Sequence, residues 1–340
     1  MPFRKAEDRV GQTVSQPVTT AQIAAVAIGR NEGARLKACM ASLQGKFGRI
    51  VYVDSGSTDN SIAIAEAAGA EIVRLAEDRP FTAARGRNAG MAALPEDRIR
   101  YVQLLDGDCA LQPGWLPAAR SFLDAHPDCA VVCGRRRERR PDASVYNRLC
   151  DEEWNTPVGQ AKTSGGDALV RLDAVRAVGG FRDDLIAGEE PEMCMRLARA
   201  GWSVWRIDEE MTLHDAAMTR FSQWWRRSKR SGHAFAEGAF LHGAGPERLK
   251  VAELRRTLFW GGALPVVALA GAALVSPWAL LLLLAYPAQI LRMTIRDGGG
   301  RNALVSACFL TLGKLPETLG IAEFHIRRKI GQRSSLIEYK

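Results

Sequence analysis

The stretch "IRYVQLLDGDC" at residues 99–109 decides the fold of this chain. A short apolar run with the length of a buried strand is followed at once by two carboxylates, Asp106 and Asp108. Like charges this close repel, and each prefers water or a cation. Two interpretations follow. The carboxylates belong to a solvated turn, since Asp and Gly are common in turns, or they form a metal site that holds a phosphorylated substrate.

Further apolar runs of strand length lie on both sides of this stretch: "IAAVAIG" (23–29), "RIVYVD" (49–54), "EIVRL" (71–75) and "CAVVCG" (129–134). Segments whose apolar residues recur at helical spacing separate the first of these strand-length runs. This alternation predicts a mostly parallel sheet flanked by helices. In such sheets ligands bind beyond the carboxyl ends of the strands. Asp54, Asp106 and the loop "GRNEG" (29–33) all fall at such ends.

The bulk composition is that of a folded chain with a basic surface. Of 340 residues, 47% are hydrophobic and 25% are charged, and the formal net charge is +8. A basic surface suits nucleic acid, anionic lipid or phosphorylated substrates. The first 20 residues are polar and lack the apolar core of a signal peptide, so we expect a flexible tail at 1–20. The seven cysteines show no CxxC and no zinc spacing, which indicates reduced thiols and a cytoplasmic catalytic part.

Residues 258–291 contain no charged side chain, and a single membrane span needs only about 20 apolar residues. "SPW" (276–278) interrupts the run near its middle, which predicts a helical hairpin at 257–292. Basic residues flank both ends, and the positive-inside rule places both flanks on the cytoplasmic side. The hairpin either spans the membrane or is re-entrant. A buried hairpin in a soluble protein is the alternative.

The segments around the hairpin are basic and partly aromatic. "RFSQWWRRSKR" (220–230) predicts an amphipathic helical segment at 219–256 on a membrane interface, and 293–340 predicts a basic interfacial segment. "ALVSACFLTLG" (303–313) is too short to span a bilayer. Because the basic excess lies beside the apolar run and no nucleic-acid motif accompanies it, anionic lipid is the expected partner and nucleic acid is not.

Several polar residues of the sheet region are candidates for chemistry. Asp54 ends a strand, where its carboxylate is placed to accept a hydrogen bond from a base N–H. Arg85 and Arg87 precede a helix, and guanidinium suits diphosphate. Gly165 and Gly166 allow backbone to approach a sugar. For each, an ordinary structural role (a strand–turn–helix junction, solvated arginines, a turn) remains open.

Two further candidates lie later in the chain. Glu189 and Glu190 stand at a predicted helix start, where the helix dipole stabilises carboxylates, or where one of them acts as a general base. His214 follows an apolar stretch and precedes Asp215. It is either a structural histidine or a metal ligand with Asp215 as its supporting carboxylate.

Taken together, these stretches resemble family 2 glycosyltransferases of the GT-A fold, specifically bacterial membrane-associated members. The resemblance runs in order from about residue 22 to about residue 230. It rests on "AIGRNE", "VYVDSGSTDNS", "RGRNAG", "LLDGDC", "GGDALVR", "GGF", "GEEPEM", "RLARAGW" and "LHD". It implies an α/β, Rossmann-like GT-A domain over about 21–218, followed by the hydrophobic hairpin.

The resemblance also implies roles for individual residues. Asp54 would contact the donor base, typically uracil. Glu190, or Glu189 beside it, would be the general base. The metal, Mn²⁺ or Mg²⁺, would be held by Asp106, Asp108 and His214. The residues that would bind the nucleotide sugar are Arg30, Glu32, Asp54, Ser57, Arg85, Arg87, Asp106, Gly165, Gly166, Gln223 and Arg226.

The implied activity is inverting transfer of a sugar from a nucleotide-diphosphate donor, most often a UDP-sugar, to a hydroxyl acceptor. A lipid-linked acceptor, cell-surface polysaccharide or glycolipid synthesis, and a catalytic domain on the cytoplasmic side of the membrane complete this expectation. "QWWRR" (223–227) matches the QxxRW motif of processive members at Gln223 and Arg226. Arg227 stands where Trp is expected, so processivity is not implied.

Other functions fit less well. An aspartyl-phosphate phosphatase would use Asp106 as nucleophile, but Ala110 stands where that motif has Thr or Val. A non-catalytic membrane assembly factor on the same fold would not need the intact carboxylate pairs. A dinucleotide oxidoreductase or a P-loop protein would need glycine motifs that the sequence lacks.

Overall fold

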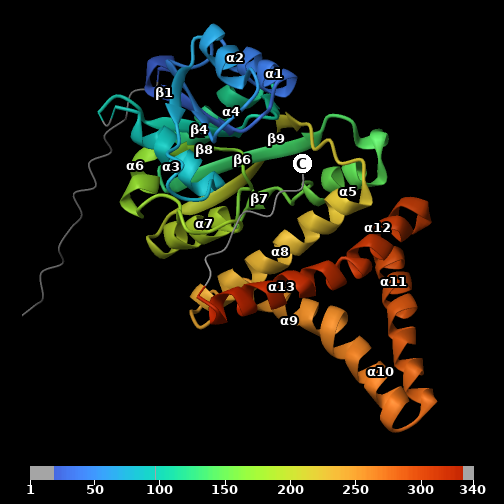
Figure 1. Cartoon of the computed structure of the whole chain (residues 1–340). Coiled ribbons are helices and arrows are strands. Elements are labelled where there is room, and N and C mark those ends of the chain that lie inside the picture. Colours follow the sequence, from blue (N-terminus) through green and yellow to red (C-terminus); the bar gives the residue numbers. More distant parts are fainter. Residues whose placement is uncertain (1–18, 96, 332–340) are drawn as a thin grey trace, which may run out of the picture.

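The computed structural model describes residues 19–95 and 97–331 of the chain. The tail expected at 1–20 therefore lies almost entirely outside the described residues, as does the end of the segment expected at 293–340. Figure 1 shows an α/β part built on one sheet, with a set of long C-terminal helices beside it.

The first part of the sheet is parallel, in the order β3-β2-β1-β4. The strands are β1 (Ile23–Gly29), β2 (Arg49–Asp54), β3 (Glu71–Arg74) and β4 (Tyr101–Asp106). The connecting helices are α1 (Ala34–Leu43), α2 (Ser61–Ala67) and α3 (Ala83–Ala92). All four strands lie where the sequence predicts them. Gly29 pairs with Asp54 and Ile28 with Asp106, so the polar strand ends are neighbours.

Beyond β4 the sheet becomes mixed. The strands are β5 (Cys109–Leu111), β6 (Cys129–Glu138), β7 (Gly159–Gln160), β8 (Ala168–Arg171) and β9 (Ser203–His214). β8 lies antiparallel between β4 and β6, and β9 runs parallel to β6 and antiparallel to β5 and β7. The sheet order is completed as β4-β8-β6-β9-β5. The predicted fold class is confirmed, with this mixed half added to the parallel one.

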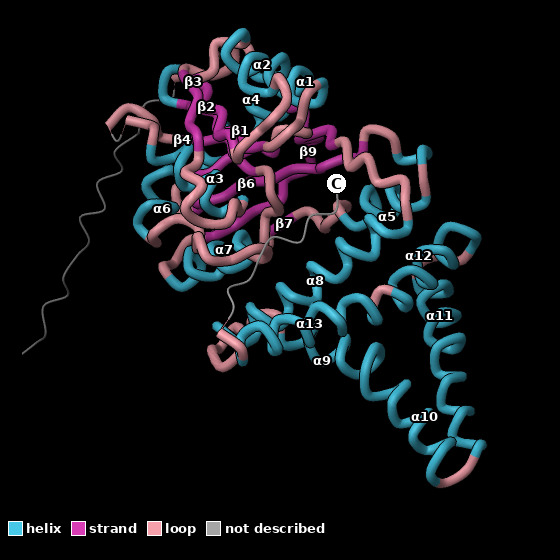
Figure 2. Tube along the Cα trace, in the orientation of Figure 1, coloured by secondary structure: helices cyan, strands magenta, loops and turns pink. Residues whose placement is uncertain are grey.

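Helices cover both faces of the sheet, as Figures 1 and 2 show. The remaining ones are α4 (Trp115–Ala125), α5 (Val145–Glu153), α6 (Leu172–Ala177) and α7 (Glu189–Arg199), with short 3-10 turns η1 (Thr20–Gln22) and η2 (Pro141–Ala143). The central strands are buried on both sides, which is why β1 and β4 are almost wholly apolar. Gln103, a polar side chain within β4, accepts a 2.7 Å hydrogen bond from the indole of Trp115.

The C-terminal part consists of helices. They are α8 (Phe221–His242), α9 (Val251–Leu258), the π-helical turn η3 (Phe259–Ala263), α10 (Leu264–Leu274), the 3-10 segment η4 (Pro277–Leu284), α11 (Ala285–Arg296), α12 (Gly300–Leu312) and α13 (Lys314–Lys329). In Figure 1, α10 and α11 project away from the sheet, while α13 lies along α8.

Three helical stretches in the described residues are long and apolar enough to cross a membrane: Val251–Leu274, Pro277–Arg296 and Gly300–Lys329. The first two form the predicted hairpin. The third corrects the expectation that residues 303–313 are too short. Gly313 keeps right-handed helical geometry, with φ −56°, so α12 continues into α13.

Candidate active site

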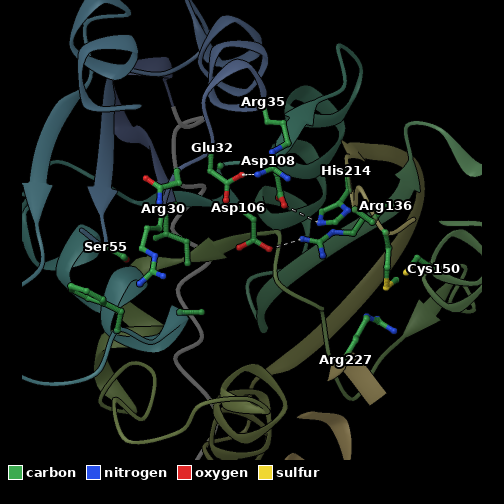
Figure 3. A pocket seen from close by; sticks show the side chains of 18 of the residues that line it. Arg30, Glu32, Arg35, Ser55, Asp106, Asp108, Arg136, Cys150, His214 and Arg227 are labelled. Carbon is green, nitrogen blue, oxygen red and sulfur yellow. Dashed lines mark hydrogen bonds and ion pairs between the residues drawn. The ribbon is translucent and has the colours of Figure 1, made fainter. Parts of the chain in front are cut away.

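A pocket of about 450 Å³ lies at the carboxyl ends of β1 and β4 (Figure 3). Arg30 and Glu32 after β1 line it, together with Asp106 and Asp108 after β4. Gly107 brings the two loops together, because its N–H donates to the Ile28 carbonyl at 2.8 Å and a Cβ at this position would approach that oxygen to 3.1 Å. The predicted gathering of polar strand ends at one edge of the sheet is therefore present.

Asp106 is held by two arginines. Its Oδ1 accepts from Arg87 at 2.9 Å and its Oδ2 from Arg136 at 3.1 Å. Its backbone N–H donates to Asp167, which also accepts from Arg136. Two guanidiniums therefore hold Asp106 in a preformed charge network at the pocket wall, in which Arg87 also pairs with Glu189.

Asp108 has a different environment. It is 2% exposed, and its Oδ2 lies 3.4 Å from Nε2 of His214. On the other side of the imidazole, Nδ1 lies 3.7 Å from Glu138. Burial lowers the pKa of His214 despite this carboxylate, so the ring is neutral at physiological pH. Each ring nitrogen of this imidazole therefore faces a carboxylate, Nε2 facing Asp108 and Nδ1 facing Glu138.

The carboxylate that supports His214 is thus Glu138, and not Asp215 as expected. Burial alone would raise the pKa of Glu138, but the nearby imidazole of His214 and hydrogen bonds from the backbone N–H groups of Arg140 and Ala216 lower it. Glu138 is therefore ionised. It comes from β6, which runs parallel to β9 and pairs Glu138 with His214 in register.

The donor set of this corner fits a divalent cation. Asp108, Cys109 and His214 each place one ligand atom within 4.8 Å of the others. Burial raises the pKa of Cys109 well above its usual value, so it remains a thiol, whose Sγ donates to Asp108 at 3.6 Å. A carboxylate and a neutral imidazole remain, and this pair suits Mn²⁺. Asp106 and Asp167 form a second group with Cys109, but there Arg136 already lies between the carboxylates.

The turn after β2 is built around Asp54. Its Oδ2 accepts from the backbone N–H groups of Gly56 and Ser57, at 3.0 and 2.9 Å. Its Oδ1 is buried and has no hydrogen-bond partner among the described residues. Ser57 accepts a hydrogen bond from the N–H of Asn31, which ties this turn to the loop after β1. Asp54 therefore keeps one acceptor atom uncommitted.

The two glutamates at the start of α7 have separate partners. Glu189 accepts from Arg87 at 2.7 Å, so Arg87 bridges it to Asp106. Glu190 accepts from the backbone and the hydroxyl of Ser164 and from the thiol of Cys194. Burial raises the pKa of Glu190 above its usual value even though these hydrogen bonds lower it. A raised pKa suits a general base, because the pKa of the carboxylate then lies closer to the pH at which the enzyme works.

Gly166 lies against the Asp106 network. A Cβ at this position would stand 3.0 Å from Arg87 Nη2 and from Asp106 Oδ2, and 3.2 Å from Arg136. Gly165 before it has φ +80°, which favours glycine. The paired glycines let the loop pass close over the charges.

Only some of the predicted site residues line the pocket itself: Arg30, Glu32, Asp106, Asp108 and His214. The others lie outside its lining: Asp54, Ser57, Arg85, Arg87, Gly165, Gly166, Glu189, Glu190, Gln223 and Arg226. Three of these have partners that separate them from the Asp106 network. Arg85 is buried and donates to the carbonyls of Ala76, Arg79 and Pro80, so it holds a loop. Gln223 accepts from backbone N–H groups at the start of α8. Arg226 is exposed. Their proposed contacts with the nucleotide sugar remain predictions.

Other residues complete the site and were not assigned a role in it from the sequence. They are Arg136, Glu138, Trp154, Asp167, Arg227 and Arg230. Trp154 stands edge-on to His214 at 4.6 Å, with Arg136 over its ring. Asp167 directly follows the glycine pair, which is a usable signal. Arg136 and Glu138 lie within the charged run "RRRERR" (135–140), where nothing in the pattern separates them from surface charges.

Comparison with known proteins assigns this domain. Residues 26–185 match the model of "Glycosyl transferase family 2". A pre-mycofactocin glycosyltransferase of Mycobacterium tuberculosis is 28% identical over 231 residues, which cover 63% of this chain and 46% of that protein. A TPR repeat-containing protein of Synechococcus elongatus is 32% identical over 137 residues, which cover 40% of this chain and 32% of that protein. The chain spans about half the length, or less, of these curated relatives.

Among solved structures, a mannosyltransferase from Pyrobaculum calidifontis has the same fold. It superposes with a TM-score of 0.58 at 21% identity, covering 87% of this chain and 88% of that one. The family match includes the strand ends that carry Asp54, Asp106 and Asp108, and the GT-A fold and the family resemblance expected from the sequence are confirmed. Over residues 26–185, this chain is therefore similar to glycosyl transferase family 2.

Proposed function

We propose that the chain is an inverting glycosyltransferase that moves a sugar from a nucleotide-diphosphate donor to a hydroxyl acceptor. The observation that carries this proposal is the Asp108–His214 pair beside Asp106, at the carboxyl edge of a family 2 domain. Asp108 and His214 would hold Mn²⁺ or Mg²⁺, and the metal would supply positive charge to the leaving diphosphate. Arg30 in the same pocket wall adds a guanidinium that suits phosphate.

The remaining groups have roles that follow from their contacts. Asp54 offers its Oδ1 to a base N–H, with a UDP-sugar as the expected donor. Glu190 takes the proton of the acceptor hydroxyl as that oxygen attacks the anomeric carbon and the bond to the diphosphate breaks. Ser164 and Cys194 orient Glu190 by donating to its Oε1. Glu189 is paired with Arg87, which makes it the less available base.

The acceptor is proposed to be lipid-linked and the protein membrane-associated, in cell-surface polysaccharide or glycolipid synthesis. Side chains of the hairpin such as Val266, Leu274 and Trp278 are more than half exposed, so the surface of the hairpin is apolar. The basic flanks of the hairpin favour a catalytic domain on the cytoplasmic side. The alternative of a buried soluble hairpin finds no support in this exposure.

The test is the thermal unfolding of the detergent-purified chain with UDP, GDP, CDP and ADP, each with Mn²⁺ and with EDTA. GDP is included because the Pyrobaculum protein was solved with GDP-Man and Mn²⁺. A ligand that binds only the folded state raises the melting temperature. We expect one nucleotide to do so only with metal, and Asp108→Ala to abolish the shift.

Asp142→Ala is the matched control, since Asp142 is exposed and outside the pocket. The melting temperature of this variant should rise with nucleotide and metal as that of the wild type does. The absence of a shift with every nucleotide would overturn the proposal. Nucleotide binding without turnover of any donor would favour the non-catalytic assembly factor.

A further inference from the structure

A second cavity, of about 690 Å³, lies between the α/β part and the C-terminal helices. We call it the seam cavity. Its walls come from α5, α8, the region of α9, and α12–α13, so neither part of the molecule forms it alone. It contains none of the residues to which the proposed donor chemistry is assigned.

The seam cavity adjoins the active-site pocket. Cys150 of α5 and Arg227 of α8 line both. Figure 3 shows these two side chains on the side of the pocket away from Arg30 and Ser55. Arg227 forms a bidentate ion pair with Glu153, at 2.7 and 3.0 Å, which joins α8 to α5 at this boundary. A molecule in the seam cavity therefore lies next to the active-site pocket, separated from it only by the boundary that Cys150 and Arg227 form.

One part of the seam cavity is aromatic and apolar. Phe309 of α12 meets Trp224 of α8 edge-on at 5.1 Å and Tyr146 of α5 at 5.7 Å. Leu310 beside it is 50% exposed. It belongs to Gly300–Lys329, one of the three stretches long and apolar enough to cross a membrane. An alkyl chain entering from the bilayer would meet matching surface here.

The polar part of the lining is rich in carboxylates. Five acidic residues line the cavity against three basic ones. Two of the basic residues, Arg227 and Lys314, are already paired with lining carboxylates, Glu153 and Glu317. Two further lining carboxylates, Glu253 and Asp297, are paired with Lys250 and Arg296 outside the lining. The charges of the lining are therefore mostly balanced already, which favours an uncharged head group over an anionic phosphate. Carboxylate and hydroxyl groups, such as those of Glu152 and Ser231, instead suit the hydroxyls of a sugar or polyol.

We propose that the seam cavity binds the acceptor as an amphiphile, with its alkyl chain on Trp224 and Phe309 and an uncharged, hydroxyl-bearing head that reaches the active site past Cys150 and Arg227. This inference rests on the proposed transferase function and specifies its acceptor as a neutral glycolipid or polyol lipid. A phosphate-headed lipid is an outcome that would contradict it.

The test is photo-crosslinking of the full chain in phosphatidylcholine nanodiscs, using an alkyl glucoside with a diazirine on its alkyl chain. We expect labelling of the segments that contain Trp224 and Phe309. Ser231 lines the cavity, and Ser231→Trp should fill it and reduce labelling by roughly tenfold, the equivalent of about 1.4 kcal/mol. Ser222→Trp is the matched control on the same helix, exposed and outside both cavities, and should label as the wild type does.

A second pair of variants repeats the test from another helix, in case Ser231→Trp fails to fold. Ala303→Trp fills the cavity from α12, while Leu304→Trp places the same side chain on the exposed face of that helix. Unlabelled glucosyl diacylglycerol should compete with the probe, and polyprenyl phosphate should not. Unchanged labelling in both filling variants, or labelling confined to the hairpin, overturns the site. Stronger competition by polyprenyl phosphate overturns the assigned head group.

The two proposals fail separately. The melting shift with nucleotide and Mn²⁺ is measured on the same preparations, and the filling variants should retain it because Ser231 and Ala303 do not line the active-site pocket. If the filling variants lose crosslinking but keep the melting shift with nucleotide, the result bears on the seam cavity alone. If the wild type shows no melting shift with any nucleotide, the proposed transferase function is overturned.

Discussion

Asp106 and Asp108 stand two positions apart, yet the fold gives the two carboxylates different partners. Asp106 lies between Arg87 and Arg136, whereas Asp108 faces the neutral imidazole of His214. The difference arises because the chain reverses at Gly107 and sends Asp108 toward β9, which pairs with β5. Two residues of one motif therefore have different chemistry: one is neutralised in advance, and the other is available to a cation.

At the scale of the residue, Glu138 should control metal affinity without touching the metal. Glu138→Gln removes the charge that orients His214 and supports its basicity. We expect metal-dependent nucleotide binding to weaken by roughly 10- to 100-fold, measured by Mn²⁺ titration of the nucleotide-induced melting shift. Glu210→Gln, at a half-exposed side chain, is the control. An unchanged Mn²⁺ dependence in Glu138→Gln would remove Glu138 from the site.

The assignment of the base makes a second prediction. Glu190→Gln should lower turnover by about 10²- to 10⁴-fold while nucleotide binding is retained, because proton transfer is lost and the charge network is not. Glu189→Gln breaks the pair with Arg87 and should mainly weaken nucleotide binding through Asp106. Steady-state rates and melting shifts on both variants separate the two effects. The reverse pattern would make Glu189 the base.

At the scale of the element, α8 and α13 pack through glycines. A Cβ on Gly232 would overlap the backbone of Glu317, and one on Gly320 would overlap the backbone of Lys229. The salt bridge between Lys229 and Glu323 lies at the same interface. Small residues let the two helices approach with backbone in contact. The position of α13, and with it one wall of the seam cavity, depends on this approach.

Gly232→Leu should therefore separate α8 from α13. We expect a loss of about 1–3 kcal/mol or more, since backbone atoms have no room to yield, seen as a lower melting temperature and faster proteolysis between the two parts. Gly238→Ala on the same helix meets side-chain atoms of Lys250 and Leu249 and no backbone atom of α13, and it should change stability little. Equal melting temperatures for Gly232→Leu and wild type would contradict the observed packing.

A buried glutamate of α8, Glu237, predicts that the stability of the protein depends on pH. Burial raises the pKa of Glu237 to about 7, with Asp184 adding to this rise and Arg182 opposing it. The folded state then binds a proton that the unfolded state releases, so stability falls as pH rises from about 4.5 to about 7. His233, 3.6 Å away, acts in the opposite direction, because burial lowers its pKa to about 4.

Glu237→Gln should therefore raise stability at pH 8 by on the order of 2 kcal/mol and leave it nearly unchanged at pH 4. The measurement is the unfolding midpoint of variant and wild type across this range. Glu66→Gln, exposed on α2, is the control. A stabilisation that is the same at both pH values would show that Glu237 does not titrate in this way.

At the scale of the whole molecule, the α/β part and the apolar helices meet through α8 and α13, and the hairpin extends beyond them (Figure 1). The hairpin arms are 24 and 20 residues long, and 11% and 0% of their most apolar windows are buried. Such a surface is stable only against lipid or another apolar partner.

Charges placed on the hairpin should therefore release the protein from membranes. Leu269 and Leu282 are both exposed apolar residues of the hairpin. An arginine at either position should cost about 2.5–3.5 kcal/mol at the centre of a bilayer. The double variant should float less with phosphatidylglycerol vesicles than wild type. Val158→Arg, an equally exposed site on the α/β part, should not change flotation. Equal flotation of all three proteins would place the hairpin outside the membrane.

By itself, the sequence determined the first four strands, the edge at which Asp54 and Asp106 meet, and the hairpin. These depend on local patterns: buried parallel strands are continuous apolar runs, and a long run without charge has few structural alternatives. Only the tertiary structure decided that Glu138 supports His214, that Arg85 holds a loop, that α12 and α13 join, and that a cavity adjoins the active site. Those features depend on the pairing of β6 with β9 and on the approach of α8 to α13. Such contacts join segments far apart in the chain, where no local pattern distinguishes a buried charge from a solvated one.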